Sequence, residues 1–168
     1  GDVLRSYALT FGHNSEWNNG GERQFTRLSL DTELTWSNFW RPQASTTYSF
    51  PSQNHRLTRG GPSMEAPAGW NASLDLESNP SAETRWTVAT DFGRDELGGW
   101  SGGLEAELSM IPDPRWQVSL APSYERHVDS RQYVTFRGEG SPATYGGRYI
   151  FAFTDRTTLA IETRLTLT

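Results

Sequence analysis

Glu105 and Glu107 lie two residues apart, so on a β-strand their carboxyl groups would share one face, about 7 Å apart. That separation suits the paired acid and base of a glycoside hydrolase. The same spacing also arises on any strand whose polar and apolar residues alternate, because side chains alternate between the two faces. We therefore expect no catalytic residues here and predict that the protein is not an enzyme.

Other side chains that could bind a metal or act in catalysis also lack the spacing of a known site. Asp91, Asp95 and Glu96 offer oxygen ligands for calcium, but they lack the alternate spacing of a calcium loop, and we expect a solvated turn. The segment 127–130 holds the three residue types of a hydrolytic triad, although sequence neighbours rarely achieve that geometry, and we expect a polar loop. The histidines form no HExxH array. The sequence therefore predicts neither a metal site nor a cofactor.

Composition narrows the class of protein. The chain has 168 residues, a net charge of −5, no cysteine and seven tryptophans, and 35% of its residues are hydrophobic. No basic run is present, so we expect no nucleic-acid partner. No apolar stretch approaches the roughly 18–20 residues of a membrane-spanning helix. The aromatic content argues against disorder.

The dominant pattern has a period of two. Over residues 28–36, Leu and Trp alternate with Ser, Asp, Glu and Thr, which indicates a strand with one apolar and one polar face. Repetition of this pattern predicts about ten strands, and several reach ten residues or more, which suits a tilted bilayer-spanning strand. The expected strands cover residues 3–12, 23–40, 43–50, 67–77, 83–92, 100–111, 115–126, 131–138, 145–154 and 157–168.

Tight turns near residues 40–43, 79–81 and 112–115 alternate with longer links at 12–24, 51–67, 93–99 and 126–131. This alternation is typical of an outer-membrane barrel, with short periplasmic turns and longer outer loops. The pattern weakens at the end, where it puts a short hairpin at Asp155 and Arg156 on the loop side and the long link 138–147 on the turn side. We expect an all-β, antiparallel, up-and-down transmembrane-type barrel, as a single domain over 1–168 that is part of a longer protein. A soluble β-sandwich is the alternative.

Each face of the expected barrel has a role. Tryptophans near strand ends on the apolar face would form two aromatic girdles in outer-membrane lipid; they are Trp36, Trp70, Trp86, Trp100 and Trp116. The polar face would line the lumen, as a cation-preferring pore or as a lattice of ion pairs that plugs it. The lumen-facing residues are Asp31, Glu33, Asp75, Glu77, Glu105, Glu107, Glu125, Glu162 and Arg164, with Arg27, Arg85 and Arg148 interspersed.

The segment Arg59, Gly60, Gly61 and Pro62 is not a phosphate loop, because the GxxxxGK[ST] pattern is missing and no helix follows. Its glycines would let the long 51–67 loop bend sharply or enter the lumen. We expect this loop to gate or constrict the mouth.

The pieces 57–64, 67–70, 131–134, 146–152, 157–159 and 163–168 together resemble the C-terminal barrel of a bacterial domain-of-unknown-function family. The resemblance covers roughly 23–168. It implies an outer-membrane-like barrel that usually follows a carbohydrate-binding-module-like sandwich, and it brings no established reaction. Family members continue with a Pro-Asp turn and at least one more strand, so further strands or partner chains would close the sheet.

Three functions therefore stand open at this point: a pore in the bacterial outer membrane, a plugged barrel that anchors or displays a surface domain, and a soluble carbohydrate-binding β-protein whose Trp faces bind sugar rings.

Overall fold

The computed structural model describes residues 3–144 and 146–167. Residues 1, 2, 145 and 168 fall outside this description, and with them the last position of the strand expected over 157–168. The described chain is almost entirely antiparallel β-structure, as the period of two predicts. Its one short helical turn, η1 (Pro142–Thr144), is of the 3-10 type.

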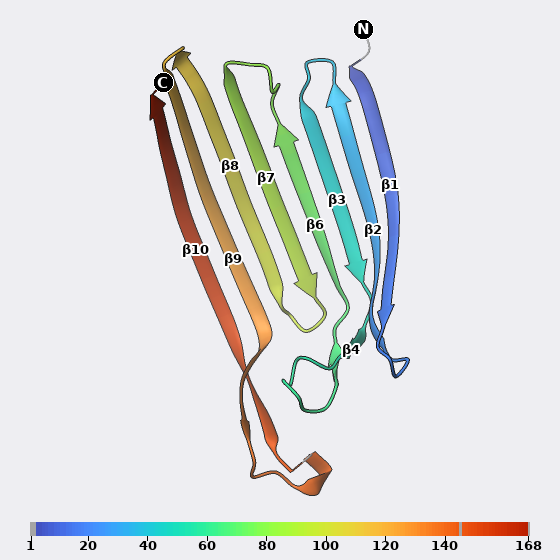
Figure 1. Ribbon diagram of the computed structural model, residues 1–168. Helices are drawn as coiled ribbons and strands as arrows, with labels where there is room; N and C mark the ends of the chain where they lie inside the picture. The colour runs from blue at the N-terminus through green and yellow to red at the C-terminus, as the bar shows by residue number, and fades with distance from the viewer. Residues whose placement is uncertain (1–2, 145, 168) are drawn as a thin grey trace.

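Eight strands form one up-and-down sheet with the order β1-β2-β3-β6-β7-β8-β9-β10 (Figure 1). Their bounds are β1 (Leu4–Trp17), β2 (Arg23–Trp36), β3 (Arg41–Ser49), β6 (Gly69–Glu77), β7 (Thr84–Asp95), β8 (Trp100–Asp113), β9 (Trp116–Arg137) and β10 (Arg148–Leu167). Two short strands, β4 (Ser52–Asn54) and β5 (Met64–Ala66), pair with each other inside the link between β3 and β6.

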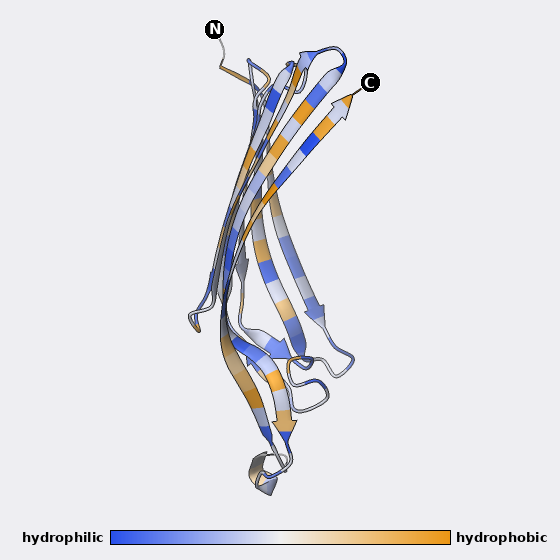
Figure 2. Ribbon diagram, turned by 90° about the vertical axis from the view of Figure 1, so that its left-hand side faces the viewer, coloured by the Kyte–Doolittle hydropathy of each residue, from blue (hydrophilic) through white to orange (hydrophobic). Residues whose placement is uncertain are grey.

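The sheet is open in the described chain, because β1 and β10 each have a partner on one side only. It is a single curved layer when viewed from its side (Figure 2). Such a layer has almost no interior: Ala68 and Val128 are the only buried hydrophobic residues among those described. The accessible surface is 11754 Å², whereas a compact protein of 18.9 kDa would expose roughly 8,300 Å². The sheet by itself therefore exposes far more surface than a compact fold of the same mass.

Two of the expected strand boundaries are wrong. The strands expected over 115–126 and 131–138 are one strand, β9, and those expected over 145–154 and 157–168 are one strand, β10. The residues that were expected to make a link and a hairpin are instead paired within the β9–β10 ladder, where Val128 lies opposite Asp155 and His127 opposite Arg156. Charged residues occur mid-strand here because Arg126 and Asp155 form an ion pair across the two strands.

With this change, the links between successive strands of the sheet fall alternately at its two ends. Short turns at 37–40, 78–83 and 114–115 lie at one end of the sheet, which we call the turn end. The links at 18–22, 50–68, 96–99 and 138–147 lie at the other, the loop end (Figure 1). Of these, 50–68 and 138–147 are long, whereas 18–22 and 96–99 are as short as the turns. The link 138–147 therefore lies with the long loops, contrary to the expectation that placed it among the turns.

Beyond residue 128, β9 pairs with β10 alone, because its last partner on β8 is Trp100. Residues 129–144 and 146–154 thus form a two-stranded extension, the ribbon, which projects past the loop end (Figure 1). The pairing of β9 with β10 shifts register twice in the ribbon, between Ile150 and Phe151 and between Ala152 and Thr154.

Candidate functional site: the layered polar face

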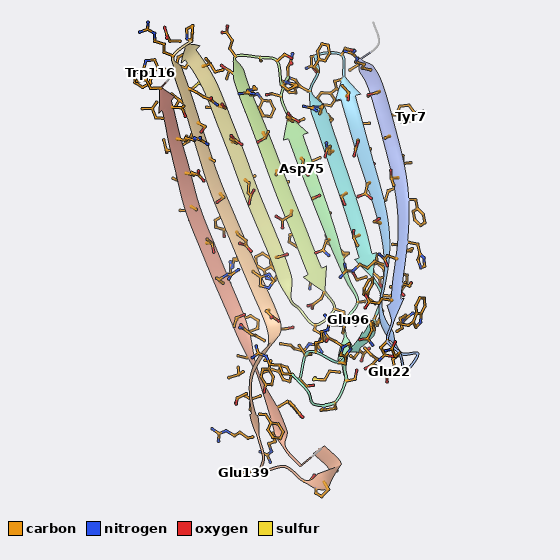
Figure 3. The ribbon with its side chains drawn as sticks, viewed as in Figure 1. Tyr7, Glu22, Asp75, Glu96, Trp116 and Glu139 are labelled. Atoms are coloured by element: carbon orange, nitrogen blue, oxygen red, sulfur yellow. The ribbon has the colours of Figure 1, made fainter. Side chains whose placement is uncertain are left out.

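The register decides which side chains share a face, since directly opposite residues of antiparallel strands point to the same side. Alternate residues on each strand are polar or apolar, so the pairing joins them into a polar face and an apolar face. The hydropathy colours alternate along the strands accordingly (Figure 2). Asp75 lies near the middle of the sheet, and Trp116 lies at the turn end (Figure 3).

The carboxylates in the middle of the polar face lie in three neighbouring rows. One row runs across the sheet from β1 to β10 as Thr10, Asp31, Ser45, Ser73, Asp91, Gly103, Glu125 and Thr158. The next row toward the turn end holds Glu33, Gln43, Asp75, Ala89, Glu105 and Ser123. The third holds Arg41, Glu77, Thr87 and Glu107. Glu105 and Glu107 therefore do share a face, as members of two extended acidic rows.

The rows on either side of this acidic band are different in charge. Toward the loop end lies a row without carboxylates: Gly12, Ser29, Thr47, Asn71, Gly93, Ser101, His127 and Arg156. Toward the turn end, Arg85 and Arg164 flank Ser109 and Ser119 in one row. The polar face is thus layered from a row with one arginine and no carboxylate, through three rows with carboxylates, to a row with two arginines.

Few of the charges on this face neutralise each other. Arg41 donates to Glu77 at 2.8 Å, from the directly opposite position on β3. Arg156 lies 3.7 Å from Glu125. Both pairs are partly exposed, so each contributes little to stability. Among the described residues, no ion pair involves Asp31, Asp75 or Glu105, and the middle of the face keeps its negative charge.

All the residues expected to face a lumen lie on the polar face, including Glu162 opposite Ala121 and Arg164 opposite Ser119. That this face encloses a lumen stays a prediction. The exception among the interspersed basic residues is Arg148, which lies in the ribbon, beyond the sheet. Sequence reasoning missed Arg41, whose role depends on its register opposite Glu77 and carries no local signal.

The tryptophans gather at the two ends of the sheet. Trp36, Trp86 and Trp116 lie at the turn end, and Trp70 and Trp100 lie at the loop end. Trp40, which was not singled out from the sequence, packs edge-on against Trp86 at 4.9 Å and stacks near Trp36 at 6.2 Å. At the loop end, Phe92 lies 5.3 Å from Trp70 and 6.2 Å from Trp100.

Large side chains cover the apolar face between these ends and remain exposed. Leu74 and Leu104 are each 51% exposed, and Leu159 on the β10 edge is 73% exposed. The middle of this face runs from the row that holds Trp86 and Leu108 to the row that holds Phe92 and Gly102. Within it, Arg126 is the only charged residue in the described part of the chain. Its guanidinium reaches outward to Asp155 and lies 5.3 Å from the Trp100 ring.

The 51–67 link is a packed structure that contacts the ribbon. Thr58 is 2% exposed, and its hydroxyl donates to the carbonyl of Pro62 at 2.8 Å. Arg59 has a φ of 51° and places its guanidinium 5.0 Å from the Tyr133 ring. Arg131 donates from Nη1 to the carbonyl of Glu65 at 2.9 Å.

Gly60 and Gly61 serve this link in different ways. Gly60 has a φ of 103°, a conformation that suits glycine. Gly61 lies against the Tyr149 ring, where a β-carbon would overlap it. The glycines therefore shape and dock the loop, and its gating role stays a prediction.

The acidic residues of the 93–99 segment are used by the loop itself. Asp95 accepts from the backbone N–H of Leu97 at 2.8 Å and of Gly99 at 2.9 Å. Glu96 accepts from the N–H of Ala68 at 2.9 Å. No group of three or more His, Asp or Glu side chains in the described part of the chain could hold a metal ion.

The segment 127–130 is part of strand β9, so the expectation of a polar loop there is wrong. Asp129 accepts from the N–H of Arg131 at 2.8 Å, within its own strand. His13 lies on β1 and His55 follows β4, so the histidines come from separate parts of the fold.

No helix within the described residues has the length and hydropathy needed to cross a membrane. No family model, no curated protein and no solved structure matches the chain.

Proposed function

We propose that this sheet forms the wall of an outer-membrane β-barrel whose apolar face contacts lipid and whose polar face lines a cation-preferring passage. The observation that carries the proposal is the division of one sheet into an exposed apolar face with tryptophans at both ends and a polar face with three acidic rows. A soluble sheet would bury the apolar face against a second layer.

The dimensions support lipid as the partner of the apolar face. From Trp100 to Met110, β8 runs ten residue steps, about 34 Å along the strand. At a tilt of about 40° this projects to roughly 26 Å, close to the apolar band of outer-membrane barrels. Tryptophans at the two ends of the strands would then lie at the two membrane surfaces.

The open edges of β1 and β10 must also be satisfied, because unpaired backbone groups are not tolerated in hydrocarbon. The closing strands come from the rest of a longer protein, as the family resemblance implies, or from partner chains. The acidic rows would then attract cations into the enclosed space, while the row with Arg85 and Arg164 would set a barrier at the turn end.

A plugged barrel that anchors a surface domain is the second candidate. It is favoured by one observation, the packing of the 51–67 link against the ribbon through Arg59 and Tyr133. A loop held in this way is suited to blocking a mouth, whereas a solvated loop would leave it open.

Planar-bilayer recordings on the full-length protein test the pore. We expect conductance with a preference for cations. This preference should be reduced in Glu105→Gln and Asp75→Asn and retained in the matched amide exchange Glu139→Gln, which lies in the ribbon. Insertion without conductance would reject the pore and favour the plugged barrel. Folding and full solubility of the intact protein without detergent or lipid would reject both.

A further inference from the structure

Two arginines near the tip of the ribbon occupy directly opposite positions, Arg137 on β9 and Arg148 on β10. Opposite positions bring the Cα atoms within about 4.5–5.5 Å, and like charges there destabilise the strand pair. Both side chains are exposed. Neither forms an ion pair with any carboxylate in the described residues.

Packed aromatic rings on the other face of the ribbon support the backbone that carries this pair of arginines. The rings of Phe136 and Tyr149 pack 5.0 Å apart. Gly147 lies under the Phe136 ring, where a β-carbon would overlap it. Backbone hydrogen bonds from Gly140 to the carbonyl of Gly146, at 3.2 Å, and from Gly146 to that of Ser141, at 3.1 Å, close the tip. The two arginines therefore belong to a packed hairpin.

A hollow of about 550 Å³ lies beside the two arginines. Thr135, which lies opposite Ile150, is part of its lining, and Val134 and Ile150 contribute exposed apolar surface. Glu139 also lines the hollow. Its carboxylate would repel a dianion, except where a hydroxyl of the bound molecule faces it as a hydrogen-bond donor. Figure 3 places Glu139 at the end of the ribbon, away from the sheet.

We infer that Arg137 and Arg148 form a binding site for a phosphate-type dianion. From directly opposite positions, two arginine side chains can direct their N–H donors to the oxygens of one tetrahedral anion, and the bound charge would relieve their mutual repulsion. The same chemistry is presented by a soluble phosphate ester and by a lipid phosphate headgroup, and Val134 and Ile150 would add contacts to an acyl chain. The inference rests on the ribbon alone and does not require the sheet to face lipid.

Titration calorimetry on the full-length protein in detergent tests the site, with inorganic phosphate and dihexanoyl phosphatidic acid as probes. We expect saturable binding that weakens about tenfold or more in Arg137→Gln and in Arg148→Gln, and that weakens with added salt. Arg115→Gln is the control, because it removes the same charge from an exposed side chain at the turn end. Equal binding of both probes identifies a phosphate group in general as the ligand, and binding of the lipid probe alone identifies a headgroup.

Thermal unfolding gives a second readout. Phosphate should raise the melting temperature of the wild-type protein by more than that of the Arg137→Gln, Arg148→Gln double variant, because a bound ligand adds to the general stabilisation that excluded phosphate gives to both proteins. Without phosphate, the double variant should be at least as stable as wild type. The inference is overturned if neither probe binds, if the double variant binds as well as wild type, or if Arg115→Gln loses as much affinity.

Discussion

Arg126 donates two parallel hydrogen bonds to Asp155, from Nε to Oδ1 at 3.0 Å and from Nη2 to Oδ2 at 2.7 Å. The pair joins β9 to β10 at the point where the ribbon leaves the sheet. The guanidinium also lies over the Trp100 ring of β8. One side chain thus connects three consecutive strands where the support of the wider sheet ends.

Arg126→Lys tests this connection. Lysine keeps the charge but loses the fork that contacts both carboxylate oxygens, so we expect faster amide hydrogen exchange in residues 129–137 and 148–154 and unchanged exchange in β2 and β3. Arg156→Lys is the matched control, because the contact of Arg156 with Glu125 is longer, at 3.7 Å. Equal exchange in wild type and Arg126→Lys would mean that the pair does not hold the ribbon.

Leu74→Arg tests the lipid contact of the apolar face. In a bilayer, an arginine in the middle of this face should lower the free energy of unfolding by about 2–4 kcal/mol. Denaturant titration in lipid vesicles measures this loss. Ser73→Arg is the control, since it places the same side chain on the polar face, one residue away and beside Asp91. A similar loss from both substitutions would contradict a lipid-facing surface.

Gly61→Ala tests the docking of the 51–67 link. The new methyl group would overlap the Tyr149 ring, and overpacking of this kind costs about 1–3 kcal/mol. We expect the link to detach before the sheet unfolds, seen as faster proteolysis within 51–67. Gly138→Ala is the control, because its added β-carbon would lie 4.0 Å from the nearest neighbouring atom. In this variant, cleavage within 51–67 should remain at the wild-type rate. Cleavage of Gly61→Ala at the wild-type rate would show that the contact is dispensable.

The strands were predictable because polar and apolar residues alternate within each of them, and this pattern is visible without knowledge of the neighbouring strands. Leu28 to Trp36 show a period of two whatever their neighbours are, and the structure confirms an antiparallel up-and-down sheet of such strands. The error at 126–131 and 155–156 arose where charged residues suggested exposed turns. Two of those charges, Arg126 and Asp155, instead pair across the ladder, although they lie 29 residues apart in the chain.

The candidate site was only partly predictable for the same reason. Each carboxylate could be assigned to a polar strand face from its own neighbours. Their grouping into rows depends on register, which turn geometry and strand lengths determine together. The opposition of Arg137 and Arg148 follows from the ribbon's register shifts, and no local pattern contains it.

The open sheet imposes a parity rule on whatever completes it. Strand directions alternate across the sheet, so β1 and β10 run in opposite directions. If every pairing in a closed wall is antiparallel, the number of additional strands between β10 and β1 must be even, whether they are supplied by this protein or by a partner. A single extra strand would run parallel to β1 and could not close the ring by hairpin-type pairing. One added hairpin would satisfy this rule, and so would two strands supplied separately at the two edges.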